Sequence, residues 1–305
     1  MKALVTGVGG FVGAHLAARL VGDGWDVAGT VRPGGSQARL VDLGLRDAID
    51  VFEADLGDPR ATAAAGRAAR VDVAFLLAAA RAEATPAERG ATTAVNSAGA
   101  VWLVDALGDQ CHAVVRLGSS TEYAQMDGPI DETAPVAPQS FFGATKAAGS
   151  LLLVAAAARR GVRSAVLRAF QVYGPLDHAE RLVPTALRAA HAGTTLPLTE
   201  PGRCRDWVYV DDVVECCVRA ALADDLSSGQ VLNVGTGRQT TNEGLVAEIV
   251  RVTGRSVDVT VGAHGGRQWD APSWVSDPSR PPDLLGWEAK VDLAGGLARC
   301  WEARV

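Results

Sequence analysis

The sequence has 305 residues, 48% of them hydrophobic, and a formal net charge of −6. This length supports one large core or two smaller ones, and the acidic balance gives no basic surface for nucleic acid. The five cysteines contain no C-x-x-C pair, no basic leader precedes the first apolar run, and no uncharged apolar stretch of about 18 residues occurs. We therefore expect a cytoplasmic protein without a metal site or a membrane span.

Short apolar runs alternate with longer alanine-rich stretches through the first two thirds of the chain. The predicted strands are Ala3–Thr6, Asp26–Val31, Asp50–Glu53, Val73–Leu77, Ala113–Gly118, Ser164–Arg168 and Val231–Asn233. The predicted helices are Gly10–Asp23, Asp58–Arg70, Ala91–Leu107, Phe141–Arg160 and Arg181–Ala192. Several runs lack strict alternation, as is typical of parallel strands buried on both faces. The order predicts an α/β fold with a Rossmann-type doubly wound parallel sheet.

The pattern loosens after about residue 172. Helices expected near Val210–Ala223 and Thr241–Thr253, among loops rich in Gly, Pro and Trp, indicate a smaller C-terminal α/β lobe. We expect a dinucleotide-binding domain over residues 1–172, to which the strand near 231–233 returns, and mainly a substrate-binding lobe over 173–305. Ligands of doubly wound sheets bind at the carboxyl ends of the strands, which places the substrate in a cleft between the lobes.

A glycine-rich turn, Thr6-Gly-Val-Gly-Gly-Phe-Val-Gly13, follows the first strand and opens the first helix. Gly7 permits the tight turn, Gly10 lets the backbone approach a pyrophosphate, and Gly13 lets the helix pack on the strand. The helix N-terminus offers free N–H groups and a partial positive charge to phosphates. The motif predicts dinucleotide binding, with a purely structural turn as the alternative.

The end of the second strand bears on the choice of cofactor. Val31 occupies the position where an NAD site usually has an acidic residue for the ribose 2′-hydroxyl, and Arg32 follows it. An arginine there can pair with a 2′-phosphate, which favours NADP(H) over NAD(H); the alternative is a solvated loop arginine. Asp55, in the next loop, is predicted to meet the adenine, with helix capping as its alternative role.

With these motifs in view, the chain resembles the extended short-chain dehydrogenase/reductases, in the NAD(P)-dependent epimerase/dehydratase branch that acts on nucleotide sugars. Gly29-Thr-Val-Arg32 and Gly118-Ser-Ser-Thr-Glu-Tyr123 look most like the GDP-4-keto-6-deoxymannose reductase and dehydratase subgroup. The other stretches that carry the resemblance are Leu77–Ala80, Asn96, Leu167–Pro175, Gly202–Asp212, Leu232–Gly237 and Leu285–Trp287. The likeness covers nearly the whole length.

The resemblance implies two sets of binding residues. The cofactor set is Gly7, Gly10, Phe11, Val12, Gly13, Arg32, Asp55, Leu56, Leu77, Ala78, Ala79 and Lys146. The substrate set is Ser120, Thr121, Gln171, Arg205 and Arg267. Arg205 is similar to an arginine that grips the diphosphate of the sugar nucleotide. Gln171 replaces the usual asparagine, and the motif at Arg267-Gln-Trp-Asp270 departs from the family's Arg-Pro-Gly-Asp.

The resemblance also implies the catalytic group, in which one residue departs from the family. Ser120 matches the Ser/Thr that hydrogen-bonds the sugar oxygen, and Lys146 matches the lysine that bonds the nicotinamide ribose. Glu122 matches an acid or base of family dehydratases, with a hydrogen-bonding wall role as the alternative. Phe142 stands where the family has a tyrosine, on the helical face of Lys146, and its ring cannot carry a proton. General acid–base help is worth about 10²–10⁴ in rate.

Three explanations of Phe142 stay open. The chain is a deliberate Tyr→Phe variant, or a natural enzyme that uses Ser120, Glu122, Tyr123 or water instead, or a protein that only binds a nucleotide. The leading hypothesis is NADP(H)-dependent reduction of a 4-keto nucleotide-diphosphate sugar at C4. The alternatives are a nucleotide-sugar 4-epimerase or 4,6-dehydratase, and a non-catalytic nucleotide-binding protein.

The family resemblance further implies a homodimer. Members often pair through two long helices, which here are Ala91–Leu107 and Phe141–Arg160. The alanine-rich faces of these helices suit such a contact, and they equally suit packing on the sheet.

Overall fold

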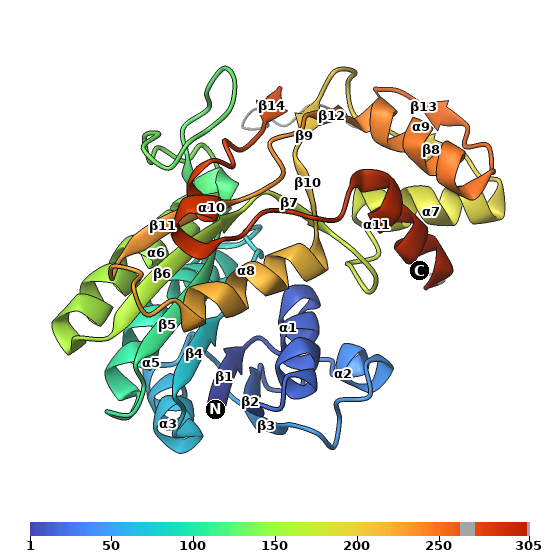
Figure 1. The fold of residues 1–305 in the computed structure, drawn as a ribbon. Coiled ribbons are helices and arrows are strands. Elements are labelled where there is room, and N and C mark those ends of the chain that lie inside the picture. Colours follow the sequence, from blue (N-terminus) through green and yellow to red (C-terminus); the bar gives the residue numbers. More distant parts are fainter. Residues whose placement is uncertain (263–271, 304–305) are drawn as a thin grey trace. The chain divides into compact units, whose positions relative to one another are not determined.

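The computed structural model describes residues 1–262 and 272–303, which divide into two compact units (Figure 1). The first unit comprises residues 1–124, 135–168 and 214–232, and the second comprises 125–134, 169–213 and 233–305. The first unit thus ends at Arg168 rather than near residue 172, and it regains a helix as well as a strand from the later chain.

The first unit is built on a seven-stranded sheet with the order β11-β6-β5-β4-β1-β2-β3. The strands are β1 (Lys2–Thr6), β2 (Asp26–Val31), β3 (Asp50–Glu53), β4 (Val73–Leu76), β5 (Ala113–Ser119), β6 (Arg163–Ala169) and β11 (Gln230–Val234). The pairs β1–β2, β2–β3, β1–β4 and β4–β5 are parallel. The chain winds outward from β1 to β3 and then returns to β4 on the other side of β1. This confirms the predicted doubly wound sheet, whose order reverses between β1 and β4.

The connecting helices cover both faces of this sheet. They are α1 (Phe11–Gly22), α2 (Ala38–Asp42), α3 (Pro59–Ala69), α4 (Pro86–Thr93), the π-helix η1 (Ala94–Ala98), α5 (Gly99–Ala106), the 3₁₀-helix η2 (Ser120–Glu122), α6 (Phe141–Arg160) and α8 (Val210–Leu222). Helices α3, α5 and α6 pack side by side. Helix α1 packs on β1 and β2, and its Arg19 pairs with Glu215 of α8 at 2.6 Å.

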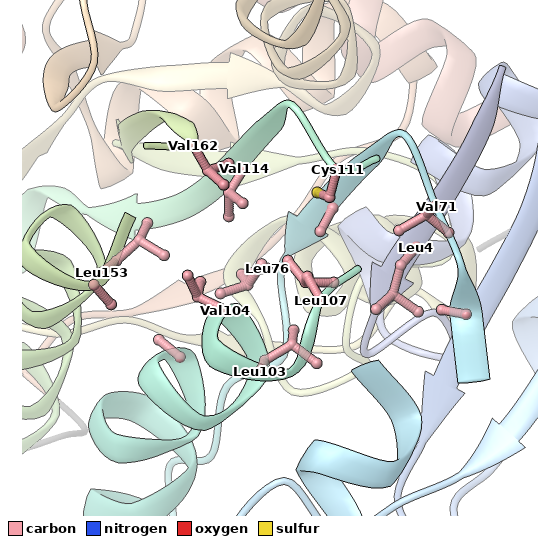
Figure 2. Close-up of a cluster of buried hydrophobic side chains, with 14 of the residues drawn as sticks. Leu4, Val71, Leu76, Leu103, Val104, Leu107, Cys111, Val114, Leu153 and Val162 are labelled. Carbon is pink, nitrogen blue, oxygen red and sulfur yellow. The ribbon is translucent and has the colours of Figure 1, made fainter. Parts of the chain in front are cut away.

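One core cluster shows how the strand period builds these layers. Leu4 of β1, Leu76 of β4 and Val114 of β5 are buried against Leu103 of α5 and Leu153 of α6 (Figure 2). Successive side chains of a strand point to opposite faces, so the neighbours of these residues face the other layer, where they are also buried. Burial on both faces explains why the strands lack polar alternation.

The long helix expected at 91–107 begins earlier and is interrupted. It starts at Pro86, because Thr85 and Glu88 form a capping box in which Thr85 Oγ1 accepts from the Glu88 N–H at 3.2 Å. The ladder then widens into the π-helix η1 before α5. Such π-turns occur frequently at functional sites.

Helix α6 matches its predicted bounds. Ser140 Oγ caps its start by accepting from the Gly143 N–H at 3.0 Å, and Gly161 ends it with a φ of +66°. It is the one helix of the described chain that is long and apolar enough to cross a membrane by length and composition. Half of that apolar window is buried inside the protein, and a core helix passes the same test.

The second unit has several short strands that the apolar pattern did not predict. Its elements are β7 (Gln171–Tyr173), α7 (Leu182–Ala192), β8 (Leu196–Pro197), β9 (Cys204–Arg205), β10 (Trp207–Tyr209), β12 (Thr240–Thr241), α9 (Asn242–Thr253), β13 (Val259–Thr260), β14 (Ser273–Trp274), α10 (Arg280–Leu285) and α11 (Leu293–Glu302). Buried Asp206 ties this unit together by accepting from Thr236 Oγ1 and Ser276 Oγ, both at 2.6 Å. A strand of two or three residues is too short to show a period.

Candidate active site

The glycine turn after β1 has the geometry that its sequence predicts. Gly7 has a φ of +69°, and a Cβ added there would lie 2.8 Å from Ala78 Cα. A Cβ on Gly13 would lie 2.3 Å from the carbonyl oxygen of Gly7. Gly10 is the N-cap of α1 and has no side chain to occupy the free N–H groups, and no acidic residue lies in the first turn. The helix N-terminus therefore offers an anion-binding surface to a pyrophosphate.

The loop after β4 is held against this turn. Thr6 Oγ1 accepts from the N–H groups of Leu77 and Ala78, at 3.0 and 3.2 Å. Gly7 therefore contacts the stretch that contains the predicted cofactor residues Leu77, Ala78 and Ala79. Any larger residue at position 7 would push these two segments apart.

The segment after β2 folds over the glycine turn. Val31 is buried, whereas Arg32 is exposed. A Cβ on Gly9 would lie 2.6 Å from the Ser36 carbonyl oxygen, and Arg39 Nη1 donates to the Gly9 carbonyl at 3.3 Å. Arg39 is thus a second cation beside the turn. The sequence pattern did not predict Arg39, because Gly34 and Gly35 lie just before the short helix that carries it and make this segment read as a loop.

The loop after β3 bears on the two roles considered for Asp55, which are contact with the adenine and helix capping. Asp55 Oδ1 accepts from the Gly57 N–H at 2.9 Å and folds the loop locally. The cap of α3 is instead Asp58, which accepts from the Ala61 N–H at 2.7 Å. The adjacent Leu56 carbonyl oxygen would lie 2.6 Å from a Cβ on Gly99, so α5 fits closely beneath this loop.

The carboxyl end of β5 brings the predicted catalytic residues together. Ser120 begins the 3₁₀ turn that follows the strand. A Cβ on Gly143 would lie 2.2 Å from the Thr121 carbonyl oxygen, so the first turn of α6 abuts this turn. Lys146 Nζ donates to the Leu117 carbonyl at 2.5 Å. Ser120, Phe142 and Lys146 consequently lie at one end of the same strand.

Lys146 is buried, and this lowers the pKa of its ammonium group. Burial lowers the pKa of Lys146 well below 10.5, and the charges of Arg116 and Arg81 lower it further, while Glu122 opposes them. Two of these charges belong to residues that the sequence did not predict as catalytic, namely Arg81 in the loop after β4 and Arg116 in β5.

Glu122 is a buried carboxylate whose oxygens are occupied. Oε1 accepts from the Ser119 N–H at 2.9 Å and from Ser150 Oγ at 3.1 Å, and Oε2 pairs with Arg168 Nε at 3.0 Å. The side chain is 0% exposed. This geometry favours a hydrogen-bonding role in the wall of the site over a role as acid or base, because proton transfer to a substrate would require breaking these bonds.

Tyr123, the other candidate proton donor beside the turn, is also fully buried. The Arg168 guanidinium carbon lies 4.3 Å from the centroid of its ring. The tyrosine therefore packs inside the protein with the Glu122–Arg168 pair, which suits a wall residue.

Asn96 joins the cofactor half of the site to the catalytic half. Its Oδ1 accepts from the Ala80 N–H, and its Nδ2 donates to the Ala80 carbonyl, both at 2.8 Å. Nδ2 also donates to Thr145 Oγ1 of α6 at 2.9 Å. The sequence marked Asn96 only as part of a resemblance; its position on the π-helix η1 places its amide at this junction.

Arg116 is a buried cation that the sequence did not single out. Its Nη2 donates to the Asn96 carbonyl at 2.5 Å, and a Cβ on Gly149 would lie 2.3 Å from Nη2. Burial lowers the pKa of Arg116 to about 10, with Glu122 acting in the opposite direction. Gly149 in α6 therefore makes room for this guanidinium.

Phe142, which is predicted to stand where the family has a tyrosine, faces a cation. The guanidinium carbon of Arg81 lies 4.3 Å from the centroid of the Phe142 ring, within the range of a cation–π contact. Arg81 follows Ala80 directly in the loop that Asn96 holds.

The remaining predicted substrate residues belong to the second unit or lie outside the described residues. Gln171 of β7 pairs with Trp207, and its N–H donates to the Asp206 carbonyl at 2.9 Å. Arg205 is half-buried on β9 and pairs with Thr240. Their roles toward a substrate stay predictions, and Arg267 lies outside the described residues. Within the described part, no three His, Cys, Asp or Glu side chains gather as a metal site requires.

Comparisons with known proteins show which family this sequence resembles. The model of the NAD dependent epimerase/dehydratase family matches residues 3–235. A UDP-glucose 4-epimerase of Mycolicibacterium smegmatis is 30% identical, covering 99% of this chain and 98% of that protein. A dTDP-glucose 4,6-dehydratase of an Actinoplanes species is 28% identical, covering 98% and 96%.

Solved structures are similar over the whole chain. A UDP-glucose 4-epimerase from Thermotoga maritima, solved with UDP-glucose, has a TM-score of 0.88 and 25% identity, covering 100% of this chain and 98% of that one. MoeE5, solved with UDP-glucose and NAD, has a TM-score of 0.84 and 27% identity at the same coverage.

Proposed function

The chain belongs to the NAD-dependent epimerase/dehydratase family, and from that premise we propose that it carries out redox chemistry at C4 of a nucleoside-diphosphate sugar. The observation that carries the proposal is the chain of contacts from the glycine turn to α6. Thr6 holds the loop after β4 at one end, and Asn96 holds it at the other. A dinucleotide on the glycine turn and a sugar beside Ser120 would then share one loop.

The leading form of this proposal is a 4-epimerase, in which one cofactor is reduced and reoxidised in each cycle. It is supported by the two full-length similarities to proteins named UDP-glucose 4-epimerase. The net 4-keto reduction that the sequence favoured therefore becomes the second candidate. One feature still supports it: Arg32 follows a buried Val31 where NAD sites carry an acid.

Each residue has a proposed task in this chemistry. When bound, the nicotinamide supplies or accepts the hydride at C4. Ser120 would hydrogen-bond the oxygen on that carbon, and Lys146 would hold the nicotinamide ribose. Glu122 would act only by fixing the turn, since its oxygens serve Ser119, Ser150 and Arg168.

A purification experiment tests the function and separates its two forms. An epimerase is expected to convert UDP-glucose to its C4 epimer without added cofactor, and to hold oxidised cofactor after purification. A reductase is expected to oxidise added NADPH only with a 4-keto sugar nucleotide. A protein that binds dinucleotide but turns over no member of a nucleoside-diphosphate sugar panel would contradict both.

We propose NADP(H) as the preferred cofactor, a choice that goes with the reductase form, and Arg32→Ala tests it. Loss of a charge-assisted hydrogen bond of about 1.5 kcal/mol would weaken NADPH binding about tenfold, and NADH binding would be unchanged. Arg46→Ala, an exposed arginine of the same crossover, is the matched control. Titration by nicotinamide fluorescence measures both affinities. Equal losses for the two cofactors would show that Arg32 does not read the 2′-phosphate.

We also propose that the protein acts as a homodimer through α6. Leu151 and Leu152 are 63% and 42% exposed in the middle of this helix, which supports the expected pairing of two copies.

A further inference from the structure

We propose that the Arg81 guanidinium stabilises negative charge on the C4 oxygen of the sugar, in place of the hydroxyl that Phe142 lacks. The inference rests on the proposed function and names one more residue for the same site. It starts from the contact between Arg81 and the Phe142 ring, which lies at the position of the family's acid/base.

The Phe142 ring forms a fixed support for the guanidinium. It projects from the first turn of α6, which Ser140 caps and which abuts the Thr121 carbonyl. The Arg81 guanidinium carbon lies 4.3 Å from the ring centroid. A cation–π contact at this distance is attractive and favours this placement. The cation therefore covers the ring that occupies the tyrosine's place.

The backbone next to Arg81 is held in place as well. The Ala80 N–H donates to Asn96 Oδ1, and the Ala80 carbonyl accepts from Asn96 Nδ2, each at 2.8 Å. The same amide bonds Thr145 Oγ1, and Thr145 is the residue before Lys146 in α6. Arg81 thus extends from a point tied directly to the helix that carries Phe142 and Lys146.

Electrostatics place the Arg81 charge near the reacting end of the site. Four charged groups act on one another here: Lys146, Arg116, Glu122 and Arg81. Burial lowers the pKa of Lys146 first, Arg116 and then Arg81 lower it further, and Glu122 raises it. Arg81 is the member of this group that lies on the exposed side, where a substrate can approach.

The chemistry fits what a guanidinium can do. In reduction, the carbonyl carbon gains a hydride from the reduced cofactor, the π electrons move to the oxygen, and water supplies the proton that completes the hydroxyl. In oxidation, water takes that proton while the hydride leaves C4. Arg81 neither gives nor takes a proton, because a guanidinium stays protonated in proteins, but its N–H donors and charge stabilise the alkoxide in both directions.

A double-mutant cycle tests the proposal. Arg81→Gln is expected to lower kcat about 10²–10³-fold, the usual loss for one oxyanion donor, with little change in cofactor affinity. Phe142→Tyr restores a donor, so Arg81→Gln should lower kcat much less in that background. Arg60→Gln, an exposed arginine of α3, is the control and should leave kcat unchanged. An Arg81→Gln variant with wild-type kcat would overturn the inference and leave the proposed function standing.

A readout independent of turnover uses the scarcity of lysine. The chain has only Lys2, Lys146 and Lys290, so ¹³C-labelled lysine gives three side-chain signals, and Lys146→Arg assigns one. Arg81→Gln should raise the pKa of Lys146, and Arg60→Gln should not. An unmoved Lys146 titration would contradict the placement of Arg81. If the wild type turns over no sugar nucleotide, the proposed function fails, and the role of Arg81 fails with it.

Discussion

The carboxyl ends of β1 and β2 differ in construction from the carboxyl ends of β4 and β5. At β1 and β2 the site is made of backbone, and Gly7 and Gly13 matter because they have no side chain. At β4 and β5 the site is made of side chains from segments that are distant in the sequence. Asn96 hydrogen-bonds the loop after β4, and Arg81 of that loop lies over the Phe142 ring. The first region has little freedom to vary, whereas the second can exchange one chemical group for another.

The largest effect is expected in the backbone region. Gly13→Val would place carbon atoms within 2.3 Å of the Gly7 carbonyl oxygen, so α1 must move off the turn. We expect dinucleotide affinity to fall at least 10²-fold and the protein to lose about 1–3 kcal/mol of stability from overpacking. Affinity titration and thermal unfolding measure the two losses.

The matched control lies on the same helix. A Cβ on Gly22 meets nothing within 4 Å, so Gly22→Ala should leave affinity unchanged. If Gly13→Val binds dinucleotide as the wild type does, the close approach of backbone at β1 is not what forms the site.

The side-chain region is tested by Asn96→Ala. The change removes the hydrogen bonds to Thr145 and to both backbone groups of the half-buried Ala80, which should cost about 2 kcal/mol. We also expect kcat to fall more than cofactor affinity, because Arg81 loses its anchor. Denaturant unfolding measures the first effect. Asn242→Ala, which removes one bond to Thr199 in the second unit, should cost about 1 kcal/mol and spare kcat. If Asn96→Ala and Asn242→Ala changed kcat equally, Asn96 would not be the residue that connects the loop after β4 to α6.

The smallest effect is the pH dependence of stability. In the folded protein the pKa of Lys146 lies below 10.5, its ordinary value in an unfolded chain. At a pH between the folded and the unfolded pKa, the unfolded chain therefore binds more protons than the folded one. Stability must therefore rise with pH through this window, by at most about 1.4 kcal/mol per pH unit. Lys146→Met should remove this rise, and Lys290→Met, at an exposed site, should keep it. Unfolding midpoints across pH check the slope; a slope that survives Lys146→Met would show that the lysine is not the cause.

The two regions also differ in how far the sequence predicts them. Gly7, Gly10 and Gly13 follow one another along the chain, so their local pattern predicts both the turn and its ligand. Arg81 and Phe142 lie far apart in the sequence, in the loop after β4 and at the start of α6, and no local pattern predicts a contact at that separation. Glu122 illustrates the same limit, since its position fits an acid or base until Arg168 and Ser150 are seen to occupy its oxygens.

The most direct test of the central claim is a single turnover with substrates deuterated at C4. The protein, loaded with oxidised cofactor, is mixed with C4-labelled and unlabelled UDP-glucose, dTDP-glucose and GDP-mannose, and the absorbance of reduced nicotinamide is followed. Hydride transfer at C4 predicts that reduced cofactor forms with at least one of them, more slowly from the labelled sugar. Reduced cofactor that forms at equal rates from both would contradict hydride transfer from C4, and no reduced cofactor with any of the three would contradict the epimerase form of the proposal.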